Sequence, residues 1–412
     1  MIATMAAGSA SATLQPEQAA AAAWHAVIIG AGPAGAAAAI RLARGGRRVL
    51  LIDRAAMPRP KVCGCCLSST ALAELRGLGF AADARGRILG AVLLERVRVI
   101  AARREVTLPT PPGGTLSRES LDTQLVQAAI EAGAAWLPWV DVTAVADKPS
   151  PHPAVSITCR PQSGRDAGAT FSLSADAAII ATGLADHVRV PDGPSRMIQP
   201  GSRIGVGTTL PSGALDLPGG ELVMAIGRGG YCGIVQLEDG RLDVAAAIDR
   251  QLVATAGGSG PAAAMILQQA AGDAPWASRA GDAFAAAPFQ ATPPLTRSAA
   301  PVAGLAGQIL RVGDAAGYVE PFTGEGMGWA LVGGRLAAEA LLASPSPAAA
   351  YREAHAAFAR QHHRRCRRIA AVLRHPWLVG AAIRVAAAAP WMAEPLLPLL
   401  VGSRRGQGAC SV

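Results

Sequence analysis

The sequence has little of what marks secreted, disulfide-bonded or membrane-spanning proteins. Its seven cysteines are an odd number without paired spacing, which argues against a disulfide framework and favours a reducing, cytoplasmic location. The first 23 residues hold no lysine or arginine, so they lack the charged start of a secretory signal, and we expect a disordered leader over 1–23. The C-terminal apolar run is interrupted by Arg384, Glu394 and prolines, so no helix long enough to span a bilayer is predicted.

Aromatic residues are also scarce, and positive charge is unevenly distributed. Aromatic residues make up 4% of the 412 residues, and abundant alanine inflates the apparent helix propensity. The formal net charge is +9, but residues 341–412 hold ten arginines against two glutamates, so the first 340 residues are close to neutral. A basic tail on a neutral protein indicates a local role for the charge, and we expect no nucleic-acid partner.

The basic tail has two interpretations. Residues 360–368 contain five arginines and precede apolar stretches at 376–383 and 385–401. In the first interpretation, the arginines meet anionic lipid headgroups while Trp377 and Trp391 enter the membrane interface, which gives peripheral membrane contact. In the second, which is the commoner arrangement, two helices pack on their own protein and the arginines face solvent.

The strongest positive signal is a glycine-rich turn near the N-terminus. The turn consists of Gly30, Ala31, Gly32, Pro33, Ala34 and Gly35. It follows the apolar run 25–29 and precedes an alanine-rich helix, so Gly30 permits a tight turn, Gly32 lets the backbone approach a pyrophosphate and Gly35 lets the helix lie close to the strand. Asp53 ends the next strand, where it would accept hydrogen bonds from adenosine ribose hydroxyls. The pattern predicts a dinucleotide with its phosphates at a helix N-terminus.

A second glycine-rich turn lies near residue 313. The apolar run 308–312 leads into Gly313 and Asp314, and a helix start rich in glycine follows at 323–328. The far end of the dinucleotide would lie here, with Asp314 accepting from a hydroxyl and the helix N-terminus offsetting negative charge on a ring. A flavin fits this better than a nicotinamide, because reduced flavin is anionic. We therefore expect FAD.

Together these motifs resemble the FAD-dependent oxidoreductases related to geranylgeranyl reductases and aromatic hydroxylases, the para-hydroxybenzoate hydroxylase fold. The geranylgeranyl reductase-like branch is the most similar. The motifs run over 25–345: Gly30-x-Gly32-x-x-Gly35, Asp53-Arg54, Pro58-Arg59-x-Lys61-x-Cys63-Gly64, Arg118-x-x-x-Asp122, Ala181-Thr182-Gly183, Gly313-Asp314 and Gly324-x-Gly326. The resemblance implies an α/β fold, with a Rossmann-like three-layer FAD-binding domain, an inserted mixed β-sheet substrate domain and C-terminal helices.

We expect the two domains to be interleaved along the chain. The FAD-binding domain would comprise 24–85, 112–190 and 291–345, the substrate-binding β domain 86–111 and 191–290, and the basic helical region 346–412. Strand-like alternation at 90–108 is expected to end in the Pro-Pro-Gly-Gly turn at 111–114. Helices are predicted from Ser117 or Ser120 to Ala132, and over 260–271.

By the resemblance, Arg118 would reach the phosphate and ribose region of FAD, and Cys63 and Gly64 would lie beside its ring end. The expected cofactor-binding residues are Gly30, Gly32, Pro33, Ala34, Gly35, Asp53, Arg54, Lys61, Cys63, Gly64, Arg118, Val142, Thr182, Gly183, Gly313, Asp314, Gly324, Glu325, Gly326 and Met327.

The cysteine loop at 63–66 has several interpretations. Packing of small, polarisable side chains against the flavin is favoured. A reactive thiol activated by Lys61 or Arg59 is the next interpretation. A relay between Cys65 and Cys66 would need a strained vicinal disulfide. No metal is expected, because no second Cys/His cluster with ligand spacing accompanies the loop.

Two reactions compete for this predicted FAD-dependent oxidoreductase. A flavin monooxygenase, with NADPH or NADH as electron donor, would hydroxylate or oxidise a lipophilic aromatic or polyketide-like substrate, and this ranks slightly ahead. The alternative is a flavin-dependent reductase of a prenyl or other unsaturated lipid, and a further alternative is a non-catalytic, membrane-docked flavoprotein. The catalytic candidates are Glu320, Glu325, Tyr231 and Cys66. Residues 136–139 read Trp-Leu-Pro-Trp, which departs from the halogenase signature Trp-x-Trp-x-Ile-Pro and argues against halogenation.

Overall fold

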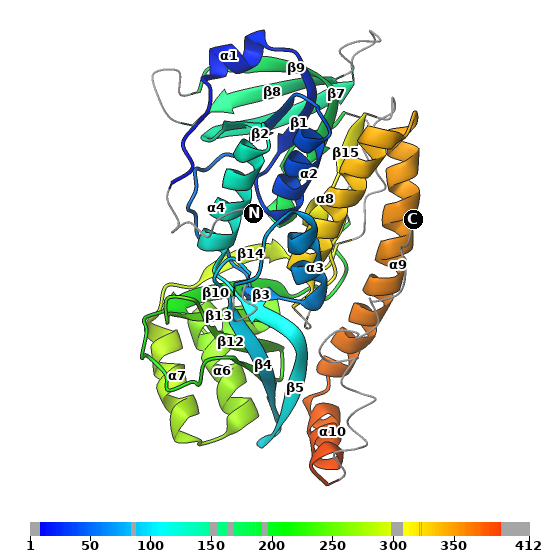
Figure 1. Cartoon of the computed structure of the whole chain (residues 1–412). Helices are drawn as coiled ribbons and strands as arrows, with labels where there is room; N and C mark the ends of the chain where they lie inside the picture. The colour runs from blue at the N-terminus through cyan, green and yellow to red at the C-terminus, as the bar shows by residue number, and fades with distance from the viewer. Residues whose placement is uncertain are drawn as a thin grey trace.

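Two β-sheets with covering helices form the framework of the chain in a computed structural model (Figure 1). The structure describes residues 9–83, 88–147, 155–162, 168–185, 187–191, 197–297, 308–320, 322 and 324–388, the side chains of 387 and 388 excepted.

The first sheet is built around parallel strands. Its order is β6-β2-β1-β9-β8-β7, with β15 pairing on β9. The parallel strands are β1 (Trp24–Ile29), β2 (Val49–Ile52), β6 (Ala135–Leu137), β9 (Phe171–Ile180) and β15 (Ile309–Arg311). In register, Ile28 lies between Leu51 and Ile179. β2, residues 26–29 of β1 and residues 177–180 of β9 are continuous apolar runs, because both faces of the sheet are covered here.

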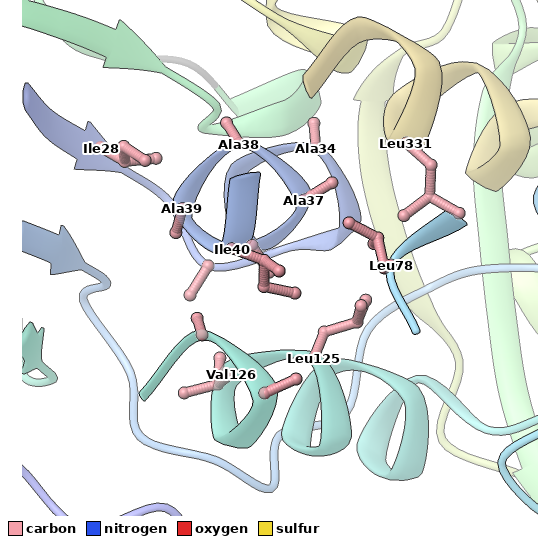
Figure 2. Close-up of a cluster of buried hydrophobic side chains, with 14 of the residues drawn as sticks. Ile28, Ala34, Ala37, Ala38, Ala39, Ile40, Leu78, Leu125, Val126 and Leu331 are labelled. Carbon is pink, nitrogen blue, oxygen red and sulfur yellow. The ribbon is translucent and has the colours of Figure 1, made fainter. Parts of the chain in front are cut away.

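Alanine-rich helices cover one face of this sheet. They are α2 (Pro33–Arg44), α4 (Arg118–Glu131) and α8 (Gly326–Ala343), with α3 (Ser69–Gly77) beside them. In Figure 2, Ile40 of α2 lies among Leu125, Val126 and Leu78. A Cβ on Gly334 would lie 2.2 Å from the Ala34 carbonyl oxygen, so α2 and α8 approach almost to backbone contact. The small alanine and glycine side chains therefore allow α2 and α8 to pack closely.

A β hairpin covers the opposite face and makes the third layer. It consists of β7 (Val140–Asp147) and β8 (Val155–Pro161), which pair antiparallel, and β8 also pairs antiparallel with β9. Val142, Val145 and Ile157 of the hairpin share a buried cluster with Val27 and Leu50 of the parallel strands. The predicted three-layer arrangement is confirmed.

The second sheet is mixed and has the order β14-β10-β13-β12-β11-β4-β5-β3. Its strands are β3 (Cys66–Leu67), β4 (Val92–Ala101), β5 (Arg104–Thr115), β10 (Ile204–Leu210), β11 (Glu221–Gly227), β12 (Gly230–Gln236), β13 (Leu242–Ile248) and β14 (Gln290–Pro294). The pair β11 and β4 is parallel, and the other pairs are antiparallel. The helices α5 (Arg250–Thr255), α6 (Ser259–Ala271) and α7 (Pro275–Ala286) follow β13 in the chain, and α6 and α7 bury their apolar residues against this sheet.

Two local predictions are wrong. The Pro-Pro-Gly-Gly sequence at 111–114 lies inside β5, and the chain instead reverses at Ala102 and Arg103, which both have positive φ. Residues 9–23, expected to belong to a disordered leader, contain α1 (Pro16–Ala21) and are held by three hydrogen bonds between Thr13 and the Trp136 backbone. The helix is short and buries only Ala19, so it carries no strong periodic signal. Residues 1–8 lie outside the described part of the chain.

The predicted helices at 117–132 and 260–271 are confirmed as α4 and α6. The Ser117 hydroxyl caps α4 by accepting from the Ser120 N–H at 3.1 Å. After α8, the basic region forms α9 (Pro347–Leu373) and α10 (Pro376–Ala388). Figure 1 shows α9 running from the first sheet past the second, with α10 at its far end. Within the described chain no single helix meets the length and hydropathy for a membrane span; α9 and α10 meet them only jointly, bent by 96°.

Candidate FAD site and substrate cavity

The first glycine turn forms the bend between β1 and α2. Gly30 has φ of +106°, and a Cβ there would lie 2.4 Å from the Ala181 carbonyl oxygen. A Cβ on Gly35 would lie 1.9 Å from the Gly30 carbonyl oxygen. A Cβ on Gly32 would meet only the Arg118 guanidinium, at 3.6 Å, and would project into open space. Gly30 and Gly35 are therefore required by packing, and Gly32 leaves room for a ligand.

Asp53 stands at the carboxyl end of β2, beside the same turn. Its Oδ2 accepts from the Ala31 backbone N–H at 2.8 Å and from Arg59 Nη2 at 3.1 Å. The residue is buried yet lines the cavity that begins at Gly32. Its Oδ1 accepts from the Ala55 backbone N–H at 3.1 Å, so the protein already hydrogen-bonds both carboxylate oxygens. The assignment of Asp53 to an adenosine ribose stays a prediction.

Positive charge gathers in the middle of the cavity. Arg118, at the start of α4, donates to Asp122 through Nε and Nη2. Burial alone would lower the pKa of Arg118, but the Asp122 carboxylate outweighs burial and raises it. Burial and the charge of Arg118 lower the pKa of Lys61 to about 8. Two neighbouring cations above a glycine turn suit a pyrophosphate.

The second glycine turn closes the other side of the cavity. Gly313 has φ of +60° and opens the 3-10 turn η2 (Gly313–Ala316), and Gly324 has φ of +68° just before α8. Burial raises the pKa of Asp314 although Lys61 opposes this. The α8 N-terminus and Asp314 thus offer a dipole and an acceptor to the ring half of a dinucleotide.

One continuous cavity of about 470 Å³ joins these groups to the second sheet. Its size is within the usual range for small-molecule sites. Beyond the second glycine turn its wall is apolar: Val206, Leu222, Met224, Tyr231, Leu295 and Phe322. The Tyr231 and Phe322 rings pack edge to face with centroids 5.0 Å apart. The two glycine turns, the cations Arg118 and Lys61 and the single cavity that joins them fit FAD. The apolar wall leaves space for an apolar substrate at the ring end.

The cysteine loop lines the same end of the cavity. A hydrogen bond from the Cys65 thiol, with help from Arg118, lowers the pKa of Cys63 to about 6. Burial raises the pKa of Cys66. β3 pairs Cys66 with Thr115, so the loop is attached to the second sheet. The three thiols therefore differ chemically, since Cys63 favours the thiolate and Cys66 keeps its proton.

Asp243 is a cavity residue that the sequence did not reveal. It lies on β13, is only 7% exposed, and is near Cys63 and Cys65. Burial raises its pKa well above the usual range for aspartate. No described residue hydrogen-bonds its Oδ2. The sequence offered one signal, a single acidic residue in the apolar strand sequence Leu242-Asp243-Val244. Because side chains alternate between the two faces of a sheet, an acid at this position is usually interpreted as facing solvent.

The predicted site residues divide into cavity-lining and buried groups. The cavity is lined by Gly30, Gly32, Pro33, Ala34, Asp53, Arg54, Lys61, Cys63, Gly64, Cys66, Arg118, Val142, Thr182, Gly183, Tyr231, Gly313, Asp314, Gly324, Gly326 and Met327. Gly35 supports the turn from behind.

Glu320 and Glu325 are not part of this lining. Glu320 is buried and accepts from Arg203 Nη1 at 2.9 Å, and the Arg203 guanidinium lies 5.7 Å from the centroid of the Tyr231 ring. Glu325 precedes α8 with a buried carboxylate. Glu320 therefore lies behind Tyr231, where it holds Arg203 and accepts a hydrogen bond from the Tyr231 hydroxyl. The catalytic roles of both glutamates stay predictions.

The sequence is similar to a protein-family model and to curated proteins. Residues 24–199 match the family model of pyridine nucleotide-disulphide oxidoreductases. A stretch of 122 residues is 39% identical to the menaquinone reductase of Mycobacterium tuberculosis (strain ATCC 25618 / H37Rv). That alignment covers 27% of this chain and 28% of the relative, so the chain spans little more than a quarter of the relative's length.

Solved structures share the fold over nearly the whole chain. The flavin-dependent brominase Bmp2 has a TM-score of 0.70 at 20% identity, covering 92% of this chain and 94% of the brominase. A geranylgeranyl bacteriochlorophyll reductase-like protein (Ta0516) from Thermoplasma acidophilum has a TM-score of 0.68 at 17% identity, covering 92% and 99%. The predicted α/β fold is confirmed.

Proposed function

We propose that this chain, which has the fold of FAD-dependent oxidoreductases, reduces a carbon–carbon double bond in an apolar small molecule, with NADPH or NADH as the electron donor. The buried Asp243 carboxyl, which lies on the cavity wall beside Cys63 and Cys65, carries this proposal. It also reverses the order that the sequence favoured, in which oxygenation ranked ahead of reduction.

Bound FAD would supply hydride, the chemistry that flavins carry in oxidoreductases. Gly32, Asp53 and Arg118 would hold its adenosine and phosphate half, and Gly313, Asp314 and the α8 N-terminus its ring half. The protein must then exclude water and deliver one proton to the second carbon of the double bond.

Asp243 meets the requirement for a proton donor. Because burial raises its pKa, the carboxyl keeps its proton at higher pH than an exposed aspartate does. Transfer from Asp243 would saturate the bond and leave a carboxylate, which regains a proton from solvent. The Cys65 thiol lies close to this carboxyl as well as to Cys63, and it would stabilise the charged form of Asp243 when it donates to Asp243 instead of Cys63. Leu222, Met224 and Phe322 would hold an apolar chain and keep water out.

The similarity to a menaquinone reductase supports a reductase without identifying the substrate. The apolar wall of the cavity supports a lipophilic class, such as a prenyl chain.

The purified, FAD-reconstituted protein tests the proposal under anaerobic conditions. With NADPH and a prenylated quinone, the product should keep two added hydrogens on the prenyl chain after its ring is reoxidised in air, and in D2O a deuterium should be found on one carbon of the former double bond. Asp243→Asn should lower turnover by about 10²-fold while retaining FAD. Asp239→Asn, a change at a solvent-exposed aspartate near the end of β12, should leave turnover unchanged. Unchanged turnover in Asp243→Asn would remove the assigned acid.

Hydroxylation of a phenolic substrate is the second candidate, and Lys61 favours it. With a pKa lowered to about 8, this cavity-lining amine is partly neutral in mildly alkaline solution and could accept a phenol proton. An oxygen atom from ¹⁸O-labelled dioxygen in the product would establish this reaction and reject reduction.

A further inference from the structure

The outer face of α10 is exposed and apolar except for Arg384. Trp377, Leu378 and Val385 are 67%, 36% and 46% exposed, and the exposed Ala381 and Ala382 lie between them along the helix. Positions 377, 381 and 385 are spaced by four, so they share one face. A surface helix of a soluble protein normally places polar residues there.

The inner face of α10 is already used for packing. Val379, Ile383 and Ala386 are buried, and a Cβ on Gly380 would lie 2.9 Å from Ala102, at the turn between β4 and β5. The helix is therefore fixed to the second sheet, and its exposed face cannot turn inward without breaking that packing.

Exposed arginines lie on the second half of α9, which precedes α10 in the chain. Arg360, Arg364, Arg367 and Arg368 are exposed and spaced three or four residues apart, and the exposed Val372 continues the same side of the helix. No acidic residue occurs anywhere from 354 to 393. Basic side chains beside an apolar helix face complement a surface that is negative outside and apolar beneath.

The substrate cavity lies behind the same two helices. Ile369 of α9 and Ile383 of α10 belong to one buried apolar cluster with Met224, Tyr231 and Phe322, which line the cavity. The far end of α9 and α10 lies beside β4 and β5, as Figure 1 shows. A lipid surface meeting α10 would therefore be separated from the cavity by one continuous apolar layer.

We propose that α10 and the arginine-bearing side of α9 form a docking surface for anionic membranes, with α10 lying in the interface and the arginines contacting headgroups. The 96° bend between the helices allows α10 to lie along the membrane while α9 rises from it. This inference is independent of the proposed reaction, because docking requires no turnover.

Vesicle sedimentation with the full-length, FAD-loaded protein tests the docking surface. The protein should bind vesicles of phosphatidylcholine with one-third phosphatidylglycerol far better than phosphatidylcholine alone, and salt should weaken binding. Changing Arg364, Arg367 and Arg368 together to Gln should lower partitioning by about tenfold or more. Trp377→Ser with Val385→Ser should also lower it, whereas Met265→Ser, which alters an exposed apolar residue on α6, should not.

Each variant should retain FAD and its melting temperature, which separates lost docking from misfolding. Equal binding to neutral and anionic vesicles, or no binding, would overturn the proposal. It would also be overturned if the Trp377 and Val385 changes turned a dimer into a monomer without affecting vesicle binding, because a second copy of the chain would then be the occupant.

Discussion

Arg118 and Asp122 form a two-point ion pair within α4, with nitrogen–oxygen distances of 2.9 and 2.8 Å, and both side chains are buried. Removing the charge of a buried partner leaves the other charge uncompensated, and this is far more costly than losing an exposed pair. The pair thus holds the Arg118 guanidinium in a fixed position on the cavity wall.

Asp122→Asn should lower the free energy of unfolding by about 3 kcal/mol, because Arg118 would remain buried without a carboxylate. Glu339→Gln is the matched control, since it alters an exposed pair with Arg335, also four residues apart, and should cost at most about 1 kcal/mol. Denaturant unfolding measures the free energy of unfolding of both variants. Equal losses would show that burial of the Arg118–Asp122 pair does not increase its contribution to stability.

Gly32→Ala and Gly35→Ala should have different effects. A methyl group at Gly32 meets only the Arg118 side chain but enters the cavity, so FAD affinity should fall while the melting temperature of the apoprotein stays nearly constant. At Gly35 the methyl group would strike the Gly30 carbonyl, and the apoprotein should lose several degrees or fail to fold. FAD titration and thermal melts distinguish the two; a melting temperature lowered equally by both changes would contradict the assignment of Gly32 to the ligand.

The Cys63 thiol should react with iodoacetamide in the apoprotein at lower pH than an ordinary cysteine. Its pKa of about 6 lies below the usual value, so the thiolate fraction and the alkylation rate should rise as pH increases through about 6 and level off above 7. Cys66 should stay unreactive over this range, because burial raises its pKa.

Peptide mass mapping locates the alkylated residue at each pH, and Cys63→Ala is the control. Reaction of Cys63 that begins only above pH 8 would show that Cys65 and Arg118 do not stabilise the thiolate. Bound FAD should slow the reaction, since Cys63 lines the cavity.

Glu320→Gln should act on stability more than on chemistry. Arg203 is nearly inaccessible and would lose its buried carboxylate partner, with an expected loss of about 3 kcal/mol. Asp249→Asn alters the partially exposed partner of the same arginine at 3.2 Å and should cost about 1 kcal/mol or less. If Glu320→Gln kept full stability but abolished turnover, Glu320 would be the catalytic residue that the sequence suggested.

The nucleotide half of the site could be predicted because its signal is local. Gly30, Gly32 and Gly35 lie within one turn, and Asp53 follows at a spacing fixed by the strand-helix-strand unit. The ring end could not be predicted in the same way, since Asp243 reaches Cys63 and Cys65 only when β13 of the second sheet meets the cysteine loop. The roles of Glu320 and Glu325 stay predictions for a related reason. Nearness to a motif in sequence does not reveal which way a side chain points, and neither carboxylate lines the cavity.

The interleaving of the two sheets determines how the chain can be divided. The first sheet takes strands from 24–52, 135–180 and 309–311, and the second from 66–67, 92–115 and 204–294. No single cut yields two fragments that each contain a complete sheet. During synthesis β9 stays without its β15 neighbour until residue 311 has emerged from the ribosome. By that point every described strand of the second sheet has already emerged. The first sheet, which begins first, is therefore the last to be completed.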